Sequence, residues 1–473
     1  MIVGFYLYKI FLVLIFLIVN VQAALIGSNF SQRDIQVLKE LDIHPSYITD
    51  YNLHRTYNRI LNGTQKRYVR KFNEASLFVP KLKEILNEQD IPATFLYMAM
   101  AESNFTIDAR SYVRATGLWQ FMSGTARRYG LKNNVYVDER MDLVKSTYAA
   151  TRYLKHLHKK FGKWYLAAIA YNCGEGRVVE AITRSSIDMY EKKYGKKNKF
   201  SKDIKKYRHA IRMYQQKRVK YRELYKIYKQ VTKWDVEPDI YQMLVVQKKI
   251  KRQYIPNESR EYIRKIISLA MMNNQSFITD NDNSHLRNIG LTSNIATVNV
   301  KGGLHLQNIA KAIGMKSRDL KKLNKHIKRD IIPTYTKEYP IHIPYSRLSR
   351  FNQNKNSIKP TVYAIHTVKQ GDNLISIGKK YGISYKFIMK FNGLKTNRLA
   401  LKQRLVIPGK LAKNSDRIAL KKVKKVRKAN YKVRRGDTLL GIAKRYSTDV
   451  KKLMADNNLK TSLIRQGDRI VIK

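Results

Sequence analysis

The chain of 473 residues is long enough for several domains, and its 44% hydrophobic content is sufficient for globular cores. Its formal charge of +58 favours nucleic acid, anionic lipid or an acidic polymer as a partner, although a solubilising lysine-rich surface explains the same charge. The single cysteine, Cys173, excludes an intramolecular disulfide and a multi-cysteine metal site.

Residues 1–23 have the pattern of an export signal. Lys9 precedes an apolar run at 10–19, and Val21-Gln22-Ala23 satisfies the small-residue rule for cleavage after Ala23. Cleavage would release the mature protein into the periplasm or cell envelope. The alternative is an uncleaved anchor that keeps the protein at the membrane, because the apolar stretch counted from Ile2 approaches spanning length.

Residues 24–90 are polar and mixed, and we expect a helical lead-in with helices around 31–41 and 64–88. The next segment is an apolar helix in which Ile91, Phe95, Met98 and Glu102 recur at helical spacing, with Pro92 in the first turn. A carboxyl on that apolar side is desolvated, which raises its pKa toward the range of a general acid. The alternative is a helix-end or salt-bridged glutamate.

Two further segments supply candidate binding groups. Gly117 to Met122 reads GLWQFM and offers two aromatic rings, an amide and a flexible glycine, which are the parts needed to hold a sugar ring. A periodic helix is predicted over Leu143 to Phe161, and a buried helix over Trp164 to Tyr171. Tyr171 and Asn172 end that helix beside a glycine-rich turn at 174–176, although a core tyrosine would give the same pattern.

Residues 184–252 form a basic segment in which Tyr207, Tyr214, Tyr221 and Tyr228 recur every seven residues among lysines and arginines. Interleaved aromatic and basic residues suit nucleic acid. The simpler hypothesis, which we prefer, is an amphipathic helix or kinked helix pair that packs its tyrosines on the domain and exposes its lysines.

Together, Ala101-Glu102-Ser103, GLWQFM at 117–122 and the run from Ala170 to Gly176 resemble the soluble lytic transglycosylases, most of all the lytic murein transglycosylase D group. Pro256 to Ile263 is similar to the closing motif of that family, with Ser259 where threonine is usual. The resemblance implies a lysozyme-like fold, Glu102 as catalytic residue, and a set of substrate-binding residues. That set is Ser103, Gly117, Leu118, Trp119, Gln120, Met122, Tyr171, Asn172 and Tyr262.

After an Asn-, Asp- and Ser-rich linker at 273–295, the chain repeats. From each aligned glycine, at 303, 371 and 436, an asparagine follows 21 residues later, at 324, 392 and 457. Each unit ends in a strand-like run, at 339–344, 403–408 and 468–472. The pattern predicts a strand, two short helices and a strand in each unit.

The second and third units resemble LysM modules, and the first is a degenerate copy with Gly303-Leu304 in place of Gly-Asp. The resemblance implies a shallow groove for N-acetylglucosamine-containing glycans, although each Gly-Asp also suits a turn and helix cap. The implied groove residues are Gly371, Asp372, Asn373, Leu374, Asn392, Gly393, Gly436, Asp437, Thr438, Leu439 and Asn457.

We therefore expect an α+β multidomain protein with a mainly α-helical lysozyme-like domain at 91–272, followed by small βααβ modules at 296–345, 362–408 and 430–473. The resemblance implies an exported lytic transglycosylase that binds peptidoglycan, cleaves the MurNAc–GlcNAc β-1,4 bond and leaves 1,6-anhydro-MurNAc ends. No cofactor, metal or nucleic acid is expected. The alternatives are a hydrolytic muramidase on the same fold, a non-catalytic wall-binding protein, and a nucleic-acid-binding protein suggested by charge alone.

Overall fold

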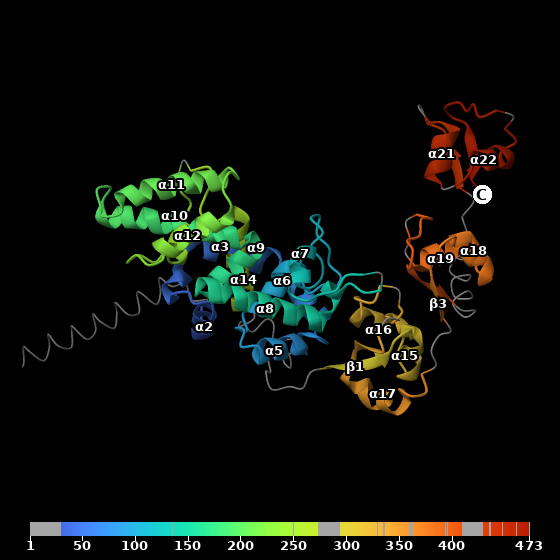
Figure 1. Ribbon diagram of the computed structural model, residues 1–473, viewed down its shortest axis with the longest axis horizontal. Coiled ribbons are helices and arrows are strands. Elements are labelled where there is room, and N and C mark those ends of the chain that lie inside the picture. The colour runs from blue at the N-terminus through green and yellow to red at the C-terminus, as the bar shows by residue number, and fades with distance from the viewer. Residues whose placement is uncertain are drawn as a thin grey trace, which may run out of the picture. The chain divides into compact units, whose positions relative to one another are not determined.

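The computed structural model describes residues 30–272, 294–358, 363–408 and 429–472, except positions 135, 249, 329, 334, 335, 393, 395, 435, 436, 447 and 460. The chain divides into two compact units, with the boundary between residues 360 and 361 (Figure 1). The predicted export signal at 1–23 lies outside the described residues. Within the described part of the chain, no helix combines the length and the apolar character needed to cross a membrane.

The first unit begins with a helical body built around one hydrophobic core. Its central helix α14 packs against α3, α6 and α9. The helices of this body are α2 (Gln32–Glu40), α3 (Tyr51–Gly63), α4 (Gln65–Glu74), α5 (Val79–Glu88), α6 (Phe95–Ser103), α7 (Ser123–Arg128), α8 (Leu143–Phe161), α9 (Trp164–Cys173), α10 (Glu175–Tyr194), α11 (Ser201–Gln215), α12 (Tyr221–Val231), α13 (Ile240–Leu244) and α14 (Asn257–Met272).

The lead-in differs from its prediction in two places. Helix α3 was not predicted, and it is capped by Asp50, whose carboxylate accepts a hydrogen bond from the Leu53 amide at 2.8 Å. The helix expected over 64–88 is split into α4 and α5 by a turn at 75–78. The lead-in also shares the hydrophobic core of the helical body, because Leu38, Leu53 and Leu82 are fully buried in it.

Helix α6 is apolar on nearly every side, because most of its residues from Phe95 to Ser103 are buried. Such a helix belongs in the centre of a domain. It begins at Phe95, so the prediction that Pro92 lies in its first turn was wrong. The reason is Thr94, whose amide and hydroxyl donate to Glu40 Oε2 at 3.0 and 2.8 Å and hold the preceding residues in a turn. The helix ends at Asn104, which adopts the left-handed conformation.

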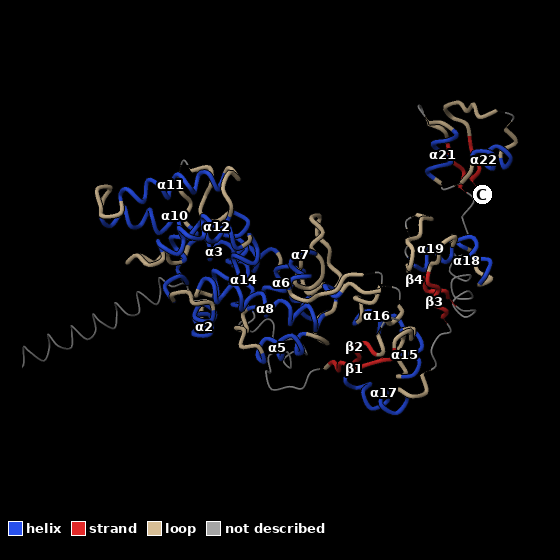
Figure 2. Tube along the Cα trace, in the orientation of Figure 1, coloured by secondary structure: helices blue, strands red, loops and turns tan. Residues whose placement is uncertain are grey.

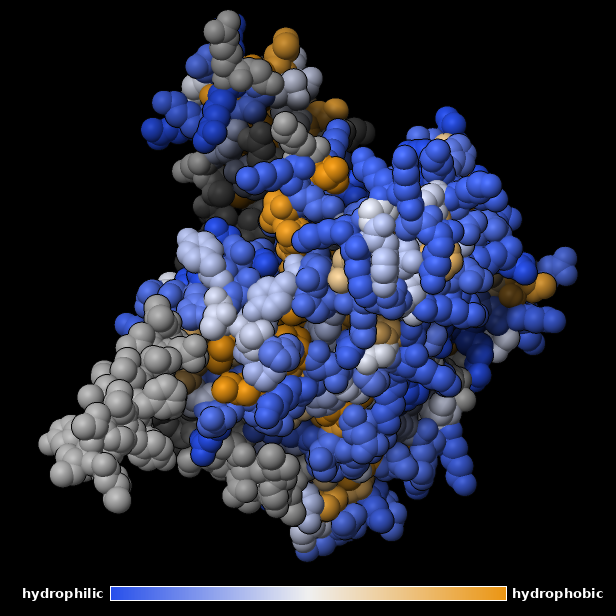
Figure 3. All heavy atoms as spheres, turned by 90° about the vertical axis from the view of Figure 1, so that its left-hand side faces the viewer, coloured by the Kyte–Doolittle hydropathy of each residue, from blue (hydrophilic) through white to orange (hydrophobic). Residues whose placement is uncertain are grey.

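The basic segment folds as the amphipathic helix pair that we preferred. Helices α10, α11 and α12 pack together, and Tyr228 is buried while Tyr207, Tyr214 and Tyr221 are half-buried against the core. Most of the basic side chains are exposed, and hydrophilic residues dominate the surface in Figure 3, which faces the end of the molecule that carries these helices. The tyrosine repeat is therefore explained by packing.

Three βααβ modules follow, as predicted, and their strands, red in Figure 2, form three separate antiparallel pairs. The first module contains β1 (Ile295–Lys301), α15 (Leu306–Ala312), α16 (Ser317–Leu323) and β2 (Glu338–Pro344), and is followed by α17 (Leu348–Asn354). The second contains β3 (Tyr363–Thr367), α18 (Leu374–Lys380), α19 (Tyr385–Asn392) and β4 (Arg404–Pro408). The third contains β5 (Ala429–Lys432), α21 (Leu439–Arg445), α22 (Val450–Asp456) and β6 (Arg469–Ile472).

The first module is packed onto the helical body. Ile295 and Leu323 are buried in the core of that body. The backbone amide of Asp138 donates to the carbonyl of His326 at 2.9 Å, and the amide of Lys328 donates to the carbonyl of Tyr136 at 2.8 Å. The first module and the helical body therefore form one folded unit, whereas the second and third modules lie in the other unit.

Candidate active site

The candidate site centres on Glu102, the penultimate residue of α6. Its carboxylate accepts a hydrogen bond of 2.6 Å from the hydroxyl of Tyr262 on α14, 160 residues further along the chain. Tyr262 is buried, with 8% of its surface exposed, and Glu102 is partly buried. The packing of α14 on α6 thus brings Tyr262 of the closing motif to Glu102.

Burial raises the pKa of Glu102 to about 7, against the opposing effects of the Tyr262 hydrogen bond and the positive charge of Lys265. The negative charge of Glu258 adds to the rise. Lys265 is held near by a 3.0 Å hydrogen bond from its Nζ to the carbonyl of Ala101. A carboxyl group with this pKa is substantially protonated at neutral pH, and its conjugate base then accepts a proton readily, so Glu102 suits general acid–base chemistry.

The GLWQFM segment has a tightly fixed backbone. Gly117 has a φ of +89°, and a Cβ at this position would lie 1.8 Å from the carbonyl oxygen of Arg140, so only glycine fits. Gln120 also adopts a positive φ of 45°. The guanidinium of Arg140 donates to the carbonyls of Phe121 and Arg114 at 3.2 and 3.1 Å, and it is itself paired with Asp138 at 2.8 Å. The glycine is therefore required by close packing and not by flexibility.

The aromatic rings of this segment do not form a sugar-binding surface, which corrects our expectation. Trp119 is fully buried and its indole N–H donates to Thr147 Oγ1 at 2.9 Å, and the second ring, Phe121, is 2% exposed. Both rings belong to the core of the domain, as does Leu118. Gln120 is partly exposed, but its amide folds back onto the Gly117 carbonyl at 2.7 Å, and Met122 is 47% exposed. Gln120 and Met122 are thus the side chains of this set that remain accessible.

Tyr171 and Asn172 connect α9 to its neighbours. The Tyr171 hydroxyl donates to the carbonyl of Trp119 at 2.8 Å, and burial together with the charge of Glu102 raises the pKa of Tyr171 well above its ordinary value. Asn172 accepts a hydrogen bond of 2.5 Å from Ser259 on α14. The Ser103 hydroxyl donates to the carbonyl of Ala99 on its own helix at 3.1 Å, so it is occupied in the structure.

The acidic residues near Glu102 in sequence are engaged elsewhere. Ion pairs join Asp108 to Lys325 at 2.7 Å, Glu139 to Lys145 at 2.6 Å, and Glu175 to Lys160 at 2.6 Å. Asp138 is paired with Arg140, and Asp142 lies beside two histidines. The carboxylate that does affect Glu102 is Glu258, which sequence reasoning missed together with Lys265. Both are found from Tyr262 by helical spacing, because residues 258, 262 and 265 share one face of α14.

The predicted groove residues of the second and third modules largely have structural roles. Asn392 Nδ2 donates to the carbonyls of Ile388 and Val406, and its Oδ1 accepts from the Val406 amide, all at 2.8–2.9 Å. Asn457 makes the same three bonds with Leu453 and Val471. Each asparagine therefore fastens the second helix of its module to the last strand. The expectation that these two side chains face a groove was wrong.

The Gly-Asp segments are turns and helix caps. Asp372 accepts hydrogen bonds of 2.7 Å from the Lys369 amide and from His366, and Asp437 accepts from the Arg434 amide and the Tyr431 hydroxyl. Asn373 caps α18 with bonds from the amides of Ile375 and Ser376. Thr438 accepts from the Gly441 amide at 3.1 Å. The alternative that these residues stabilise turns and helix starts is thus confirmed for their side chains.

The remaining predicted groove positions divide between turn, core and undescribed residues. Gly371 lies in the first turn with a φ of +83°. Leu374 and Leu439 are core residues, exposed by 2% and 1%. The next residue in each module, Ile375 and Leu440, is 55% exposed. Gly393 and Gly436 lie outside the described residues.

The helical domain thus carries a partly buried glutamate at the end of the buried helix α6, hydrogen-bonded to a buried tyrosine on α14, as expected for a lysozyme-like transglycosylase domain. The model of the transglycosylase SLT domain matches residues 82–193, the LysM-like domain of the lytic transglycosylase MltD matches 294–360, and the LysM domain matches 366–408 and 431–473. The chain is therefore a lytic transglycosylase that carries LysM domains.

The chain is also similar in sequence to two curated proteins. The chain is 26% identical over 410 residues to the membrane-bound lytic murein transglycosylase D of Escherichia coli strain K12, covering 82% of this chain and 74% of that protein. It is 34% identical over 176 residues to the N-acetylmuramoyl-L-alanine amidase sle1 of Staphylococcus epidermidis, covering 37% of this chain and 50% of that protein. The chain thus combines an SLT transglycosylase domain with an MltD-type LysM-like domain, and it is similar to lytic murein transglycosylase D over most of its length.

Proposed function

We propose that the protein cleaves the β-1,4 bond between N-acetylmuramic acid and N-acetylglucosamine in peptidoglycan, with Glu102 as both general acid and general base. Protonated Glu102 gives its proton to the glycosidic oxygen as the bond to C1 of the muramoyl residue breaks. The resulting carboxylate takes the proton of the muramoyl C6 hydroxyl, whose oxygen bonds to C1. The products are a free N-acetylglucosamine end and a 1,6-anhydro-muramoyl end, and Glu102 is protonated again.

The observation that carries this proposal is the raised pKa of Glu102 together with the engagement, in other ion pairs, of acids that lie near it in sequence. Two-carboxylate glycosidases need a second acid about 5–9.5 Å from the first, to activate water or to attack C1. An intramolecular hydroxyl replaces that group, because its effective concentration is very high. Glu102, with a pKa of about 7, is suited to both proton transfers.

The other predicted site residues would position this reaction. Tyr262 donates a hydrogen bond to Glu102 and so orients the carboxyl group. Tyr171 and Asn172 would hold the GLWQFM segment and α14 at the site through their bonds to Trp119 and Ser259. Gln120 and Met122 are the accessible side chains that would contact substrate.

We also propose that the two LysM modules hold the enzyme on glycan strands and that the first 23 residues direct export to the periplasm. The exposed Ile375 and Leu440 occupy equivalent positions at the first helix of each module and would lie against the acetamido sugars. The high net charge would add a salt-sensitive attraction to an anionic polymer. A mature N-terminus at Ala24 on the isolated envelope protein would support the export step, and an intact Met1 on cytoplasmic protein would contradict it.

Mass spectrometry of the soluble products from purified sacculi tests the reaction. Wild-type protein should release muropeptides that end in 1,6-anhydro-N-acetylmuramic acid. Reducing N-acetylmuramic acid ends would instead assign a hydrolytic muramidase, which must recruit a second carboxylate. Glu258→Gln tests whether Glu258 is that second carboxylate, because its negative charge already acts on the pKa of Glu102. A transglycosylase should tolerate this change, whereas a hydrolase that uses Glu258 should lose activity.

A further inference from the structure

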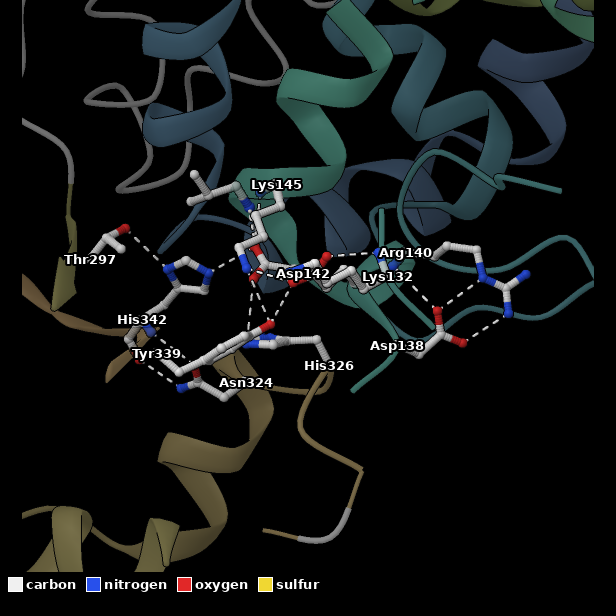
Figure 4. Close-up of polar contacts among 12 residues, drawn as sticks. Lys132, Asp138, Arg140, Asp142, Lys145, Thr297, Asn324, His326, Tyr339 and His342 are labelled. Atoms are coloured by element: carbon white, nitrogen blue, oxygen red, sulfur yellow. Dashed lines mark hydrogen bonds and ion pairs between the residues drawn. The ribbon is translucent and has the colours of Figure 1, made fainter. Parts of the chain in front are cut away.

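Three titratable side chains meet in the buried contact between the helical body and the first module (Figure 4). Asp142 is the N-cap of α8, His326 follows α16, and His342 lies on β2. Asp142 and His326 have no exposed surface, and His342 has 1%. One carboxylate oxygen and one imidazole nitrogen from each histidine lie within 4.8 Å of one another.

Several polar atoms of this cluster lack a hydrogen bond within the described residues. Within the described residues, neither ring nitrogen of His326 makes a hydrogen bond, and Oδ2 of Asp142 makes none either. The distance between His326 Nε2 and Asp142 Oδ2 is 3.4 Å. Buried polar groups nearly always make hydrogen bonds, so a completely buried imidazole that makes none through either nitrogen points to a ligand beside it.

We propose that Asp142, His326 and His342 form a binding site for a divalent transition-metal ion, best suited to Zn²⁺, which joins the catalytic body to the first module. Two imidazole nitrogens and a carboxylate oxygen are ligands that zinc accepts readily, whereas Mg²⁺ and Ca²⁺ prefer oxygen alone. Ligands of a tetrahedral zinc ion lie about 3.3–3.5 Å apart. The His326–Asp142 separation of 3.4 Å already has this value.

The surroundings leave the ligand atoms free for a metal. Asp142 Oδ1 accepts hydrogen bonds from the amides of Val144 and Lys145 and lies 3.0 Å from His342 Nε2, which leaves Oδ2 open. Nδ1 of His342 lies 3.2 Å from the hydroxyl of Thr297. In the tautomer that carries the ring proton on Nδ1 and donates it to that hydroxyl, the lone pair of Nε2 points toward Asp142 and is available to an ion placed between them, which is the arrangement usual for metal-bound histidines.

The charges around the site also allow a cation. The nearby Lys145 is bonded to Glu139 at 2.6 Å, and Glu139 also accepts from the Tyr339 hydroxyl at 2.8 Å, so the lysine charge is balanced. Asp142 therefore remains as the net charge that a divalent ion would neutralise.

A metal here would act on the active site through the segment from Asp138 to Asp142. Arg140 in this segment holds the GLWQFM backbone by its bond to the Phe121 carbonyl, and its own carbonyl packs against Gly117. Fixing Asp142 to the first module would keep this segment in place. The metal would thus have a structural role in keeping the catalytic body and the first module together.

The test uses the full mature chain, purified without a histidine tag. Zinc content after dialysis should be one ion per chain by elemental analysis. Unfolding should shift upward by roughly 5 °C with Zn²⁺ at about 100-fold over its dissociation constant, and back with a chelator. Co²⁺ substitution should give the visible absorption of a tetrahedral nitrogen–oxygen site. His326→Gln should remove all three effects, and the exposed His156→Gln should keep them.

Two results would overturn the site. One is wild-type protein that retains no zinc and whose unfolding temperature is the same with Zn²⁺ and with chelator, a result that requires no variant to fold. The other is a folded His326→Gln protein that binds Zn²⁺ and Co²⁺ as the wild type does, since the ion would then occupy another position.

Discussion

The first βααβ module and the two later ones have the same framework. In each, an asparagine fastens the second helix to the last strand, since Asn324 bonds Leu320 and His342 as Asn392 and Asn457 bond their own partners. In each, a leucine that begins the first helix is buried, at 306, 374 and 439. The asparagine that recurs 21 residues after each aligned glycine is therefore the residue that links the second helix to the last strand by hydrogen bonds.

The modules differ in their turns and in what they contact. The later modules keep the aspartate-stabilised turn at Asp372 and Asp437, whereas the first has the buried Leu304 at this point. The first module instead carries His326 and His342, which face the catalytic body. The three modules thus share a small framework of a few core residues and one asparagine, while the first module differs in its surface, which packs on the helical body.

The largest expected effect separates chemistry from binding. Glu102→Gln keeps the shape of the side chain but removes the transferable proton, and positioned proton transfer is worth about 10²–10⁴-fold in rate. Because one residue serves in both steps, the loss in release of muropeptides should reach at least this range. Co-sedimentation with sacculi should be unchanged, because the LysM modules lie in the other unit. Full activity in this variant would remove the mechanism.

Truncations test the division between the first module and the later ones. A chain ending at residue 360 should keep the unfolding temperature of the catalytic unit and lose retention on sacculi. A chain ending at residue 293 should lose stability or solubility, because Ile295, Leu323 and His342 would leave apolar and polar groups of the body uncovered. Equal stability of the two truncations would show that the first module is independent.

Retention by the later modules is measured with a fragment of residues 361–473. Part of its binding to sacculi will be electrostatic and should weaken with salt, because at about 0.5 M salt the screening length is only a few ångströms. Binding that remains at this salt concentration would report glycan recognition. Binding that disappears entirely would limit these modules to a charge interaction.

Loss of the asparagine side chains that link helix and strand should have the next largest effect, a fall in the stability of each module. Asn392→Ala removes the side-chain partner of the buried Val406 amide and of two carbonyls, and Asn457→Ala does the same at the partly buried Val471. At about 1–3 kcal/mol for an unsatisfied group, we expect about 2–4 kcal/mol of destabilisation at most. Asn373→Ala is the control, because loss of a helix cap typically costs about 1 kcal/mol. Denaturant unfolding of the 361–473 fragment measures all three. An equal effect of Asn373 and Asn392 would contradict the fastening role.

Much of the fold follows from the sequence because its signals are local. The helix from Leu143 to Phe161 was predicted with its observed limits, since Asp142 caps its start and Gly162 ends it in the left-handed conformation. The modules followed from their repeat. The role of the asparagines could not be predicted, because their partners include a strand 14 residues away. A repeated spacing does not show whether a side chain faces a groove or makes a hydrogen bond across the core.

The candidate site was only partly predictable for the same reason. Glu102 and Tyr262 could be named from motifs, but the burial of Trp119 depends on Thr147, which lies on another helix. The cluster of Asp142, His326 and His342 joins residues up to 200 positions apart on two domains, so the sequence alone predicted no metal site. Such contacts appear only when the domains are placed together.

The smallest expected effect is a difference in the sign of pH dependence between the two units. The raised pKa of Glu102, about 7 against an ordinary 4.5, means that the folded catalytic unit binds a proton more tightly than the unfolded chain. This contribution to stability is fully present below about pH 4.5 and is lost as the pH rises to 7. In the later modules, the Lys369 amide and His366 lower the pKa of Asp372, so its contribution is present above its ordinary pKa and is lost as the pH falls.

Thermal or denaturant unfolding at pH 5 and pH 8 tests this contrast. Glu102→Gln should stabilise the catalytic unit at pH 8 by on the order of 1–3 kcal/mol, because it removes a buried charge, and the gain should shrink toward pH 5. Asp372→Asn should leave the catalytic unit unchanged at both values and should weaken the acid sensitivity of the second module below pH 4. A Glu102→Gln effect that is the same at pH 5 and pH 8 would mean that Glu102 does not titrate in this range, and the acid–base role proposed for it would then need a different proton source.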